Sequence, residues 1–138
     1  MEKMIMKGWE TPAAKSAPPV ERSLKVLFSP ELNGYEKATV LFSIIPPQSA
    51  SGVHTHADCD EIMYFQGQGT ASLGEISIVI EKDLVILAPK GVPHGAINTS
   101  DSESLKIFCV YLPAILPTPL LCDAIEKSKI ELQRKQQK

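Results

Sequence analysis

Residues 54–69 read HTHADCDEIMYFQGQG, and this stretch decides the fold and the chemistry that we expect of the chain. In an extended strand, residues i and i+2 point to the same face, so His54 and His56 can direct two imidazoles to one point. Glu61 opens the next apolar run and can reach that point from a neighbouring strand. The stretch therefore predicts part of a metal site that needs a further ligand.

The third and last histidine of the chain lies in residues 89–98, which read PKGVPHGAIN. The proline and glycine predict a sharp turn into a strand on which His94, Ala96 and Asn98 share one face. All three histidines of the chain thus lie on predicted strands that can face one interior. His94 is the candidate for the missing ligand.

The rest of the chain predicts many short strands separated by turn residues. Segments such as TVLFSII (39–45) and LKIFCVYL (105–112) are rich in β-branched and aromatic residues. We expect strands at residues 22–28, 39–45, 54–56, 61–66, 70–73, 76–80, 84–88, 94–98 and 105–112. Close spacing of short strands predicts an all-β fold, an antiparallel β-barrel or jelly roll.

Both ends of the chain differ from this pattern. The prolines of the first residues predict an irregular arm, and Thr118 and Pro119 predict the cap and first position of a C-terminal helix, with Leu121, Ile125 and Leu132 at helical spacing. The expected division is an irregular N-terminal arm (1–22), a β-barrel (23–112) and a short C-terminal α-helix with its tail (113–138).

Composition excludes several classes of function. At 138 residues we expect one domain with a core of its own. The net charge of −2 and the scattered basic residues argue against a nucleic-acid partner, and no apolar run is long enough for a signal peptide or a bilayer span. Three cysteines without paired spacing (Cys59, Cys109 and Cys122) suit a reducing compartment. We therefore expect a cytoplasmic protein with neither nucleic acid nor membrane as partner.

The two histidine segments together resemble the paired signature of the cupin superfamily, whose members are RmlC-like jelly-roll barrels. The first signature is H-x-H, three or four residues, E, then a glycine turn; it is matched by His54, His56, Glu61 and Gly67. The second is P-x-G-x-x-H-x-x-x-N; it is matched by Pro89, Gly91, His94 and Asn98. The resemblance covers roughly residues 39–112.

The sequence departs from this signature in two turns. The first signature usually opens with a glycine where this chain has Gln48, and the second with a glycine where it has Asp83. Glycine eases backbone geometry in turns, so these departures do not touch the ligands.

A third departure concerns the carboxylate ligand. Gly67 comes one residue early, so an alignment on this glycine would place Asp60 rather than Glu61 at the ligand position. We favour Glu61, because Glu61, Met63 and Phe65 then alternate inward along one strand. Asp60 remains the alternative.

The resemblance implies one divalent transition metal (Fe, Mn, Ni, Cu or Zn) held by His54, His56, Glu61 and His94, with two coordination positions open. Glu61 is also the candidate catalytic residue. Other candidates for a base are Tyr64, Tyr111, Asp58 and Asp60. The residues that share faces with the ligands are expected to form the pocket wall; they are Met63, Phe65, Ala96 and Asn98.

The substrate class is predicted only broadly. No arginine lies in residues 23–133, so the strands after Arg22 offer no bidentate clamp for phosphate or carboxylate. We expect a small, mostly apolar substrate that chelates the metal through one oxygen, in oxygenase- or lyase-type chemistry. The alternatives are a non-catalytic metal-dependent binding or sensing module and a sugar isomerase or epimerase. By resemblance we expect a homodimer, with the N-terminal arm or the outer sheet as the contact.

Overall fold

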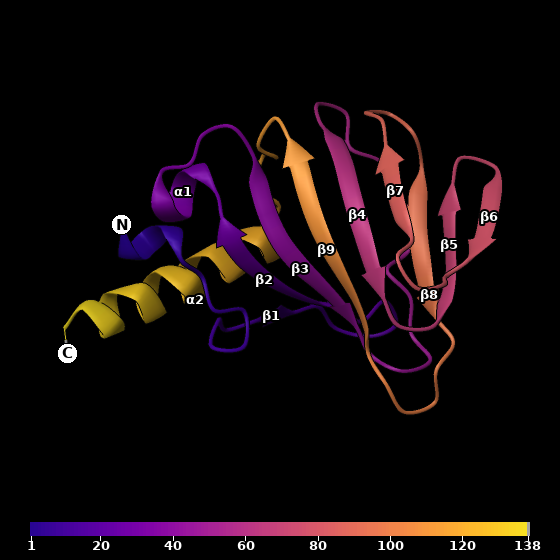
Figure 1. The fold of residues 1–138 in the computed structure, drawn as a ribbon, viewed down its shortest axis with the longest axis horizontal. Coiled ribbons are helices and arrows are strands. Elements are labelled where there is room, and N and C mark those ends of the chain that lie inside the picture. The colour runs from indigo at the N-terminus through magenta and orange to yellow at the C-terminus, as the bar shows by residue number, and fades with distance from the viewer. Residues whose placement is uncertain (138) are drawn as a thin grey trace.

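The computed structural model describes residues 1–137, which fold into two antiparallel sheets with a helix at one end (Figure 1). The strands are β1 (Ala14–Lys15), β2 (Ser23–Phe28), β3 (Thr39–Ile45), β4 (Asp60–Gln66), β5 (Gly69–Leu73), β6 (Ile76–Val79), β7 (Val85–Ala88), β8 (His94–Asn98) and β9 (Leu105–Leu112). The larger sheet has the order β1-β2-β3-β9-β4-β7, and the smaller has the order β6-β5-β8. The all-β jelly-roll prediction is confirmed.

The larger sheet carries the core because its strands alternate between a buried and a more exposed face. In β4, Glu61, Met63 and Phe65 are buried, as the alternation predicted, while Ile62 and Gln66 are exposed. β9 lies between β3 and β4 and alternates in the same way. Side chains from the inward faces of these strands therefore meet between the two sheets.

Three helices complete the described chain: the 3₁₀ helix η1 (Glu2–Met4), α1 (Pro30–Asn33) and α2 (Pro119–Gln136). The predicted cap of α2 is confirmed, since the Thr118 hydroxyl accepts a hydrogen bond from the Leu121 amide at 3.3 Å. Figure 1 shows α2 at the β1 and β2 end of the molecule, away from the small sheet. Within residues 1–137, none of the helices combines the length and the apolar content that crossing a membrane requires.

The structure differs from the predicted elements in three places. Residues 54–56 do not form a strand; His54 alone makes an isolated bridge to His94. The N-terminal arm is not wholly irregular, since β1 pairs with β2 and Ala14 in β1 is fully buried. A short helix that was not predicted, α1, follows β2 and ends at Gly34, which has a φ of 75°.

Candidate metal centre

The four predicted ligands come together between the two sheets. His94 begins β8, Glu61 lies in β4, and His54 and His56 lie in the connection from β3 to β4. The connection is held against β8 because the backbone amide of His54 donates to the His94 carbonyl and the amide of His94 donates to the His54 carbonyl, both at 2.9 Å. A two-way backbone bridge therefore sets the relative position of two of the ligands.

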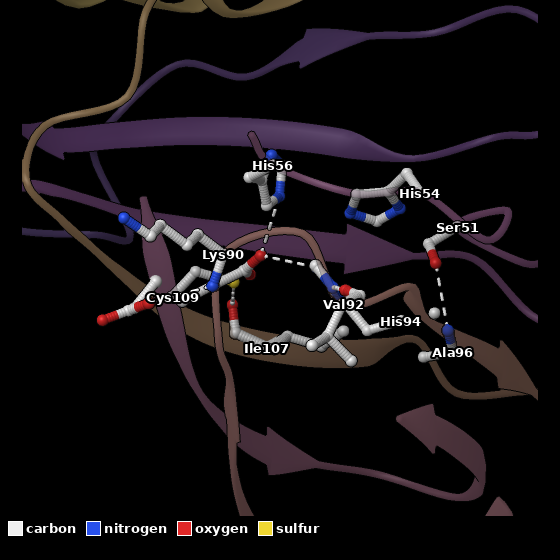
Figure 2. A network of polar contacts seen from close by, with 12 residues as sticks. Ser51, His54, His56, Lys90, Val92, His94, Ala96, Ile107 and Cys109 are labelled. Atoms are coloured by element: carbon white, nitrogen blue, oxygen red, sulfur yellow. Dashed lines mark hydrogen bonds and ion pairs between the residues drawn. The ribbon is translucent and has the colours of Figure 1, made fainter. Parts of the chain in front are cut away.

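The side chains of the cluster converge on one carboxylate oxygen. Nε2 of His56 donates to Glu61 Oε1 at 3.0 Å, and Nε2 of His94 donates to the same oxygen at 2.9 Å. Figure 2 shows the rings of His54, His56 and His94 gathered around this point, with dashed lines from His56 and His94 meeting at it. One ligand atom from each of the four residues lies within 4.8 Å of the others.

Backbone carbonyls orient two of the rings from behind. Nδ1 of His54 donates to the Gly52 carbonyl and Nδ1 of His94 donates to the Val92 carbonyl, both at 3.0 Å. Each acceptor lies two residues before its histidine. Such bonds fix the tautomer and orientation of a metal-binding imidazole and leave Nε2 for the metal. The structure thus supplies the outer hydrogen bonds that a histidine metal site needs.

These distances suit a shared metal ion. Imidazole nitrogens and carboxylate oxygens bind first-row metals at about 2.1 Å, so two ligands at right angles stand about 3.0 Å apart. The two contacts of Glu61 Oε1 with His56 and His94, at 3.0 and 2.9 Å, match that separation. Three imidazoles and one carboxylate are a donor set for a divalent transition metal. The residues present therefore fit the metal that the sequence predicted.

The charges of the cluster are unevenly distributed. Burial opposes ionisation of Glu61, but the hydrogen bonds from His56 and His94 outweigh it and lower the pKa of Glu61 to about 2. Burial acts against the charged form of His94 as well, but the bonds to Glu61 and Val92 raise the His94 pKa. Burial lowers the pKa of His54. A metal would meet an ionised Glu61, and any proton on a nitrogen that binds the metal would have to leave.

The structure places Glu61, and not Asp60, in the cluster. The Glu61 side chain is 3% exposed and bonds two of the histidines. The carboxylate of Asp60 instead accepts a hydrogen bond from the backbone amide of Lys90 at 2.9 Å. Adjacent residues of a strand point to opposite faces, so the two carboxylates cannot share the interior.

A cavity of about 20 Å³ lies beside the cluster, enough for one ion or water molecule. Its walls are formed by Arg22, Ser43, Ser51, His54, Glu61, Met63, His94, Gly95, Ala96, Ile107, Cys109 and Tyr111. Two predicted pocket residues, Met63 and Ala96, are among them, whereas Phe65 lies in the hydrophobic core.

Asn98 also lies away from this cavity. Its amide nitrogen donates to the carbonyls of Ile45 and Glu103, both at 2.9 Å, and its side-chain oxygen accepts from the Ser100 amide at 2.9 Å. The side chain of Asn98 therefore ties the loop between β8 and β9 to the end of β3. Asn98 therefore stabilises the end of β8, the strand that carries His94, and does not line the cavity.

Several residues of the cavity wall were not among the predicted pocket residues, although strand pairing would have identified them; Tyr111 was expected only as a candidate base. Tyr111 lies opposite Glu61, and Cys109 opposite Met63, in the β4–β9 register. Arg22 comes two residues before the buried Leu24, so extending the inward face of β2 by one step would have placed it in the cavity. The wall is consequently more polar than the apolar lining we expected.

Solved structures with similar folds have low sequence identity to this chain. A predicted oxalate decarboxylase from Thermotoga maritima has a TM-score of 0.69 at 21% identity, covering 81% of this chain and 99% of its own. KdgF from Halomonas sp. has a TM-score of 0.65 at 17% identity, covering 78% and 94%. An RmlC-like cupin from Shewanella frigidimarina has a TM-score of 0.64 at 16% identity, covering 80% and 90%. These similarities show the fold.

Sequence comparison adds the family. No curated protein matches the chain. The family model described as Cupin domain matches residues 41–111, which is more than half of the chain and includes all four residues of the cluster. The fold, the two histidine segments and this match agree, and the chain belongs to the cupin domain family.

Proposed function

We propose that this chain is a metal-dependent enzyme that acts on a small organic molecule by oxygenase- or lyase-type chemistry. The observation that carries the proposal is the cluster of His54, His56, Glu61 and His94, whose ligand atoms lie within 4.8 Å of one another beside a cavity. When bound there, a divalent metal would polarise a substrate oxygen and stabilise negative charge on it.

The residues around the cluster have distinct roles in this proposal. Glu61 acts as a ligand, because a carboxylate with a pKa of about 2 is too weak a base to take a proton near pH 7. This narrows the catalytic role that the sequence suggested for Glu61. Tyr111 faces the cavity, and burial raises its pKa well above the ordinary value. Its neutral phenol therefore serves as a hydrogen-bond donor to a bound substrate and not as a base.

The other base candidates lie away from the cavity. Tyr64 donates a hydrogen bond to Asp83 at the surface, and Asp60 bonds the Lys90 backbone. Neither these residues nor Asp58 line the cavity. The proposed chemistry therefore relies on the metal, and on hydrogen-bond donors, more than on a separate general base. Among the structural neighbours, the Thermotoga maritima protein is described as a predicted oxalate decarboxylase, and this supports including lyase substrates in the test.

A second candidate is a non-catalytic, metal-dependent binding or sensing module. The observation that favours it is the size of the cavity, because about 20 Å³ holds an ion or a water but no substrate without movement of the wall. An enzyme must open this wall in each cycle. A sensing module needs to hold only the metal and one or two small molecules bound to the metal.

The test starts from protein purified anaerobically without a histidine tag. We expect about one transition-metal ion per chain, and metal-dependent oxygen consumption or loss of a small organic substrate that disappears in His94→Ala. Stoichiometric metal and tight ligand binding without turnover would favour the binding module. Absence of stoichiometric metal after Fe, Mn, Ni and Zn have each been offered would overturn both candidates.

A further inference from the structure

The wall of the cavity beside the metal cluster carries one cationic side chain. Arg22 lies on its wall, and within residues 1–137 its guanidinium has no hydrogen-bond or ion-pair partner. Arg22 is only half-buried. Among the residues described, Glu61 is the one acidic residue on the same wall, and it is already bonded to two histidines.

The backbone around Arg22 is fixed from both sides. The Arg22 amide donates to the Ser16 hydroxyl at 2.9 Å, and the Ser16 amide donates to the Arg22 carbonyl at 2.9 Å. On the preceding residue, the Glu21 amide donates to the Ser49 hydroxyl at 3.3 Å. These bonds link the arm to β2 and to the loop that leads to the histidines. The guanidinium is thus held on an anchored segment, which lowers the entropy cost of using it for binding.

The surroundings of Arg22 favour an anionic ligand. A divalent metal together with the guanidinium outweighs the single carboxylate of Glu61, so the loaded site is positively charged. Ser43 and Tyr111 place hydroxyl groups on the same wall. Guanidinium and hydroxyl donors around a metal suit a carboxylate.

We propose that Arg22 is the specificity-determining residue of this site, and that it pairs with the carboxylate of a small organic acid whose second oxygen reaches the metal. This inference rests on the proposed metal-dependent function and names its substrate class. It replaces the mostly apolar substrate expected from the absence of arginine after Arg22. The guanidinium selects for charge, and the cavity, whose wall must move to admit any organic acid, favours a small one.

The test compares acids with their neutral amides on the metal-loaded protein. The probes are oxalate, pyruvate and malonate, each paired with oxamide, pyruvamide or malonamide, and binding is measured by titration calorimetry. We expect at least one acid to bind and its amide to bind at least 10-fold more weakly. Metal content is measured after each titration, because these acids also bind free metal ions.

Variants then assign the charge preference to Arg22. We expect Arg22→Gln to weaken binding of the acid by roughly 10- to 100-fold, because the charged hydrogen bonds are lost. Arg22→Lys should weaken binding less, because lysine keeps the charge and loses only the fork geometry of the guanidinium. The metal content and Tm should not change. Arg134→Gln is the matched control, since Arg134 is exposed on α2 and pairs with Glu131.

The inference is overturned if none of the acids binds to the metal-loaded protein, or if Arg22→Gln binds the acid as well as the unmodified chain does. Equal binding of acid and amide would overturn it as well. A chain that takes up no metal instead contradicts the proposed function, and that result is read from the metal analysis before any acid is added.

Discussion

His54 and His94 exchange both backbone hydrogen bonds at 2.9 Å, and their rings lie with centroids 4.5 Å apart. Each ring also donates from Nδ1 to the carbonyl two residues before it. The pair therefore forms a small antiparallel ladder with equivalent ring supports on both sides. Its geometry depends on close approach of the two backbones as much as on the imidazoles.

Gly95 makes this approach possible, and Gly95→Ala tests it. A Cβ at this position would lie 2.8 Å from the Gly52 carbonyl oxygen and 3.3 Å from the Val53 Cα. The added methyl must push the backbone that carries His54 away from β8. We expect metal affinity to fall at least 10-fold although all four ligands remain. Gly34→Ala is the control, because an alanine at its φ of 75° also strains the backbone, but at the exposed end of α1 and outside the cluster. Unchanged metal affinity in Gly95→Ala would show that the bridge does not control the site.

Glu61→Gln and Asp60→Asn separate the two neighbouring carboxylates. Glu61 bonds His56 and His94, whereas Asp60 bonds the backbone of Lys90. We expect Glu61→Gln to lose 10- to 100-fold or more in metal affinity, since a neutral amide replaces an anionic ligand. Asp60→Asn should keep stoichiometric metal. Both are measured by metal analysis after dialysis against a weak chelator, and the reverse pattern would assign the ligand position to Asp60.

The depressed pKa of Glu61 predicts how acid affects the protein once metal has been removed. The folded pKa of about 2 lies below the ordinary value of 4.5, so this carboxylate contributes stability above about pH 4.5 and loses it as the pH falls towards 2. The contribution is on the order of 3 kcal/mol. The shifts of His94 and His54 have opposite directions near neutral pH, so the acid limb is the clearer test.

Urea unfolding between pH 2 and 7 measures this contribution. We expect the free energy of unfolding to fall steeply below pH 4.5 in the original chain and to fall less in Glu61→Gln, which has no carboxyl to protonate at this position. Identical acid limbs in the two proteins would contradict a strongly paired Glu61.

Much of the fold could be predicted because its signals are local. The bounds of β3, β8 and β9 coincide with the predicted strands, and the Thr118 cap marks the start of α2. The errors came where tertiary contacts decide the structure. His54 and His56 have strand-like spacing, but the connection from β3 to β4 makes isolated bridges to β8 instead of a strand, one between Ala50 and Ile97 and one between His54 and His94. Ala14 in β1 pairs with Leu24 in β2, and this pairing was not predicted because the prolines of the arm indicate irregular structure.

The convergence of the four candidate ligands could be predicted for a reason that does not apply to the cavity wall. His54, His56, Glu61 and His94 follow a sequence pattern whose spacing encodes the site. Wall residues are brought in by strand pairing, which places Tyr111 opposite Glu61. No local sequence pattern predicts such a pairing. Arg22 was recognised in the sequence but assigned to the arm, although its side chain lies on the cavity wall.

At the two positions where this chain lacks a glycine of the signature, the backbone still has a positive φ. Gln48 and Asp83 stand where the signature has glycine, and they are the non-glycine residues with positive φ in the described chain, at 59° and 66°. The backbone has kept the left-handed conformation although the glycine is absent. This conformation costs a residue with a Cβ about 1–2 kcal/mol.

Gln48→Gly and Gln48→Ala measure this strain. Both variants lose the hydrogen bonds from Gln48 Nε2 to the loop at Thr99–Asp101, and only glycine relieves the left-handed strain. We expect Gln48→Gly to be about 1 kcal/mol more stable than Gln48→Ala in urea unfolding. Alanine is normally the more stabilising of the two residues. The normal order at this position would contradict the observed backbone conformation.

The exposed face of the larger sheet leads us to propose a homodimer. Ile62 and Leu87 lie opposite each other on β4 and β7, and Val85 lies opposite Tyr64. Ile62, Val85 and Leu87 are 37%, 55% and 54% exposed, and Phe108 continues the patch on β9 at 36%. The arm and α2 lie at the opposite, β1 and β2 end of this sheet (Figure 1). A second copy can cover such a patch with the same patch, as a two-fold interface requires.

Solution mass, measured by sedimentation or light scattering, tests this interface. We expect about twice the chain mass of 15.1 kDa, and a shift to the single-chain mass in Leu87→Lys, which places a charge within the patch. Ile130→Lys is the matched control, because Ile130 is 56% exposed on α2 and outside the patch. A single-chain mass for the original protein would contradict the dimer. A dimer that persists in Leu87→Lys and dissociates in Ile130→Lys would indicate that the interface lies on α2.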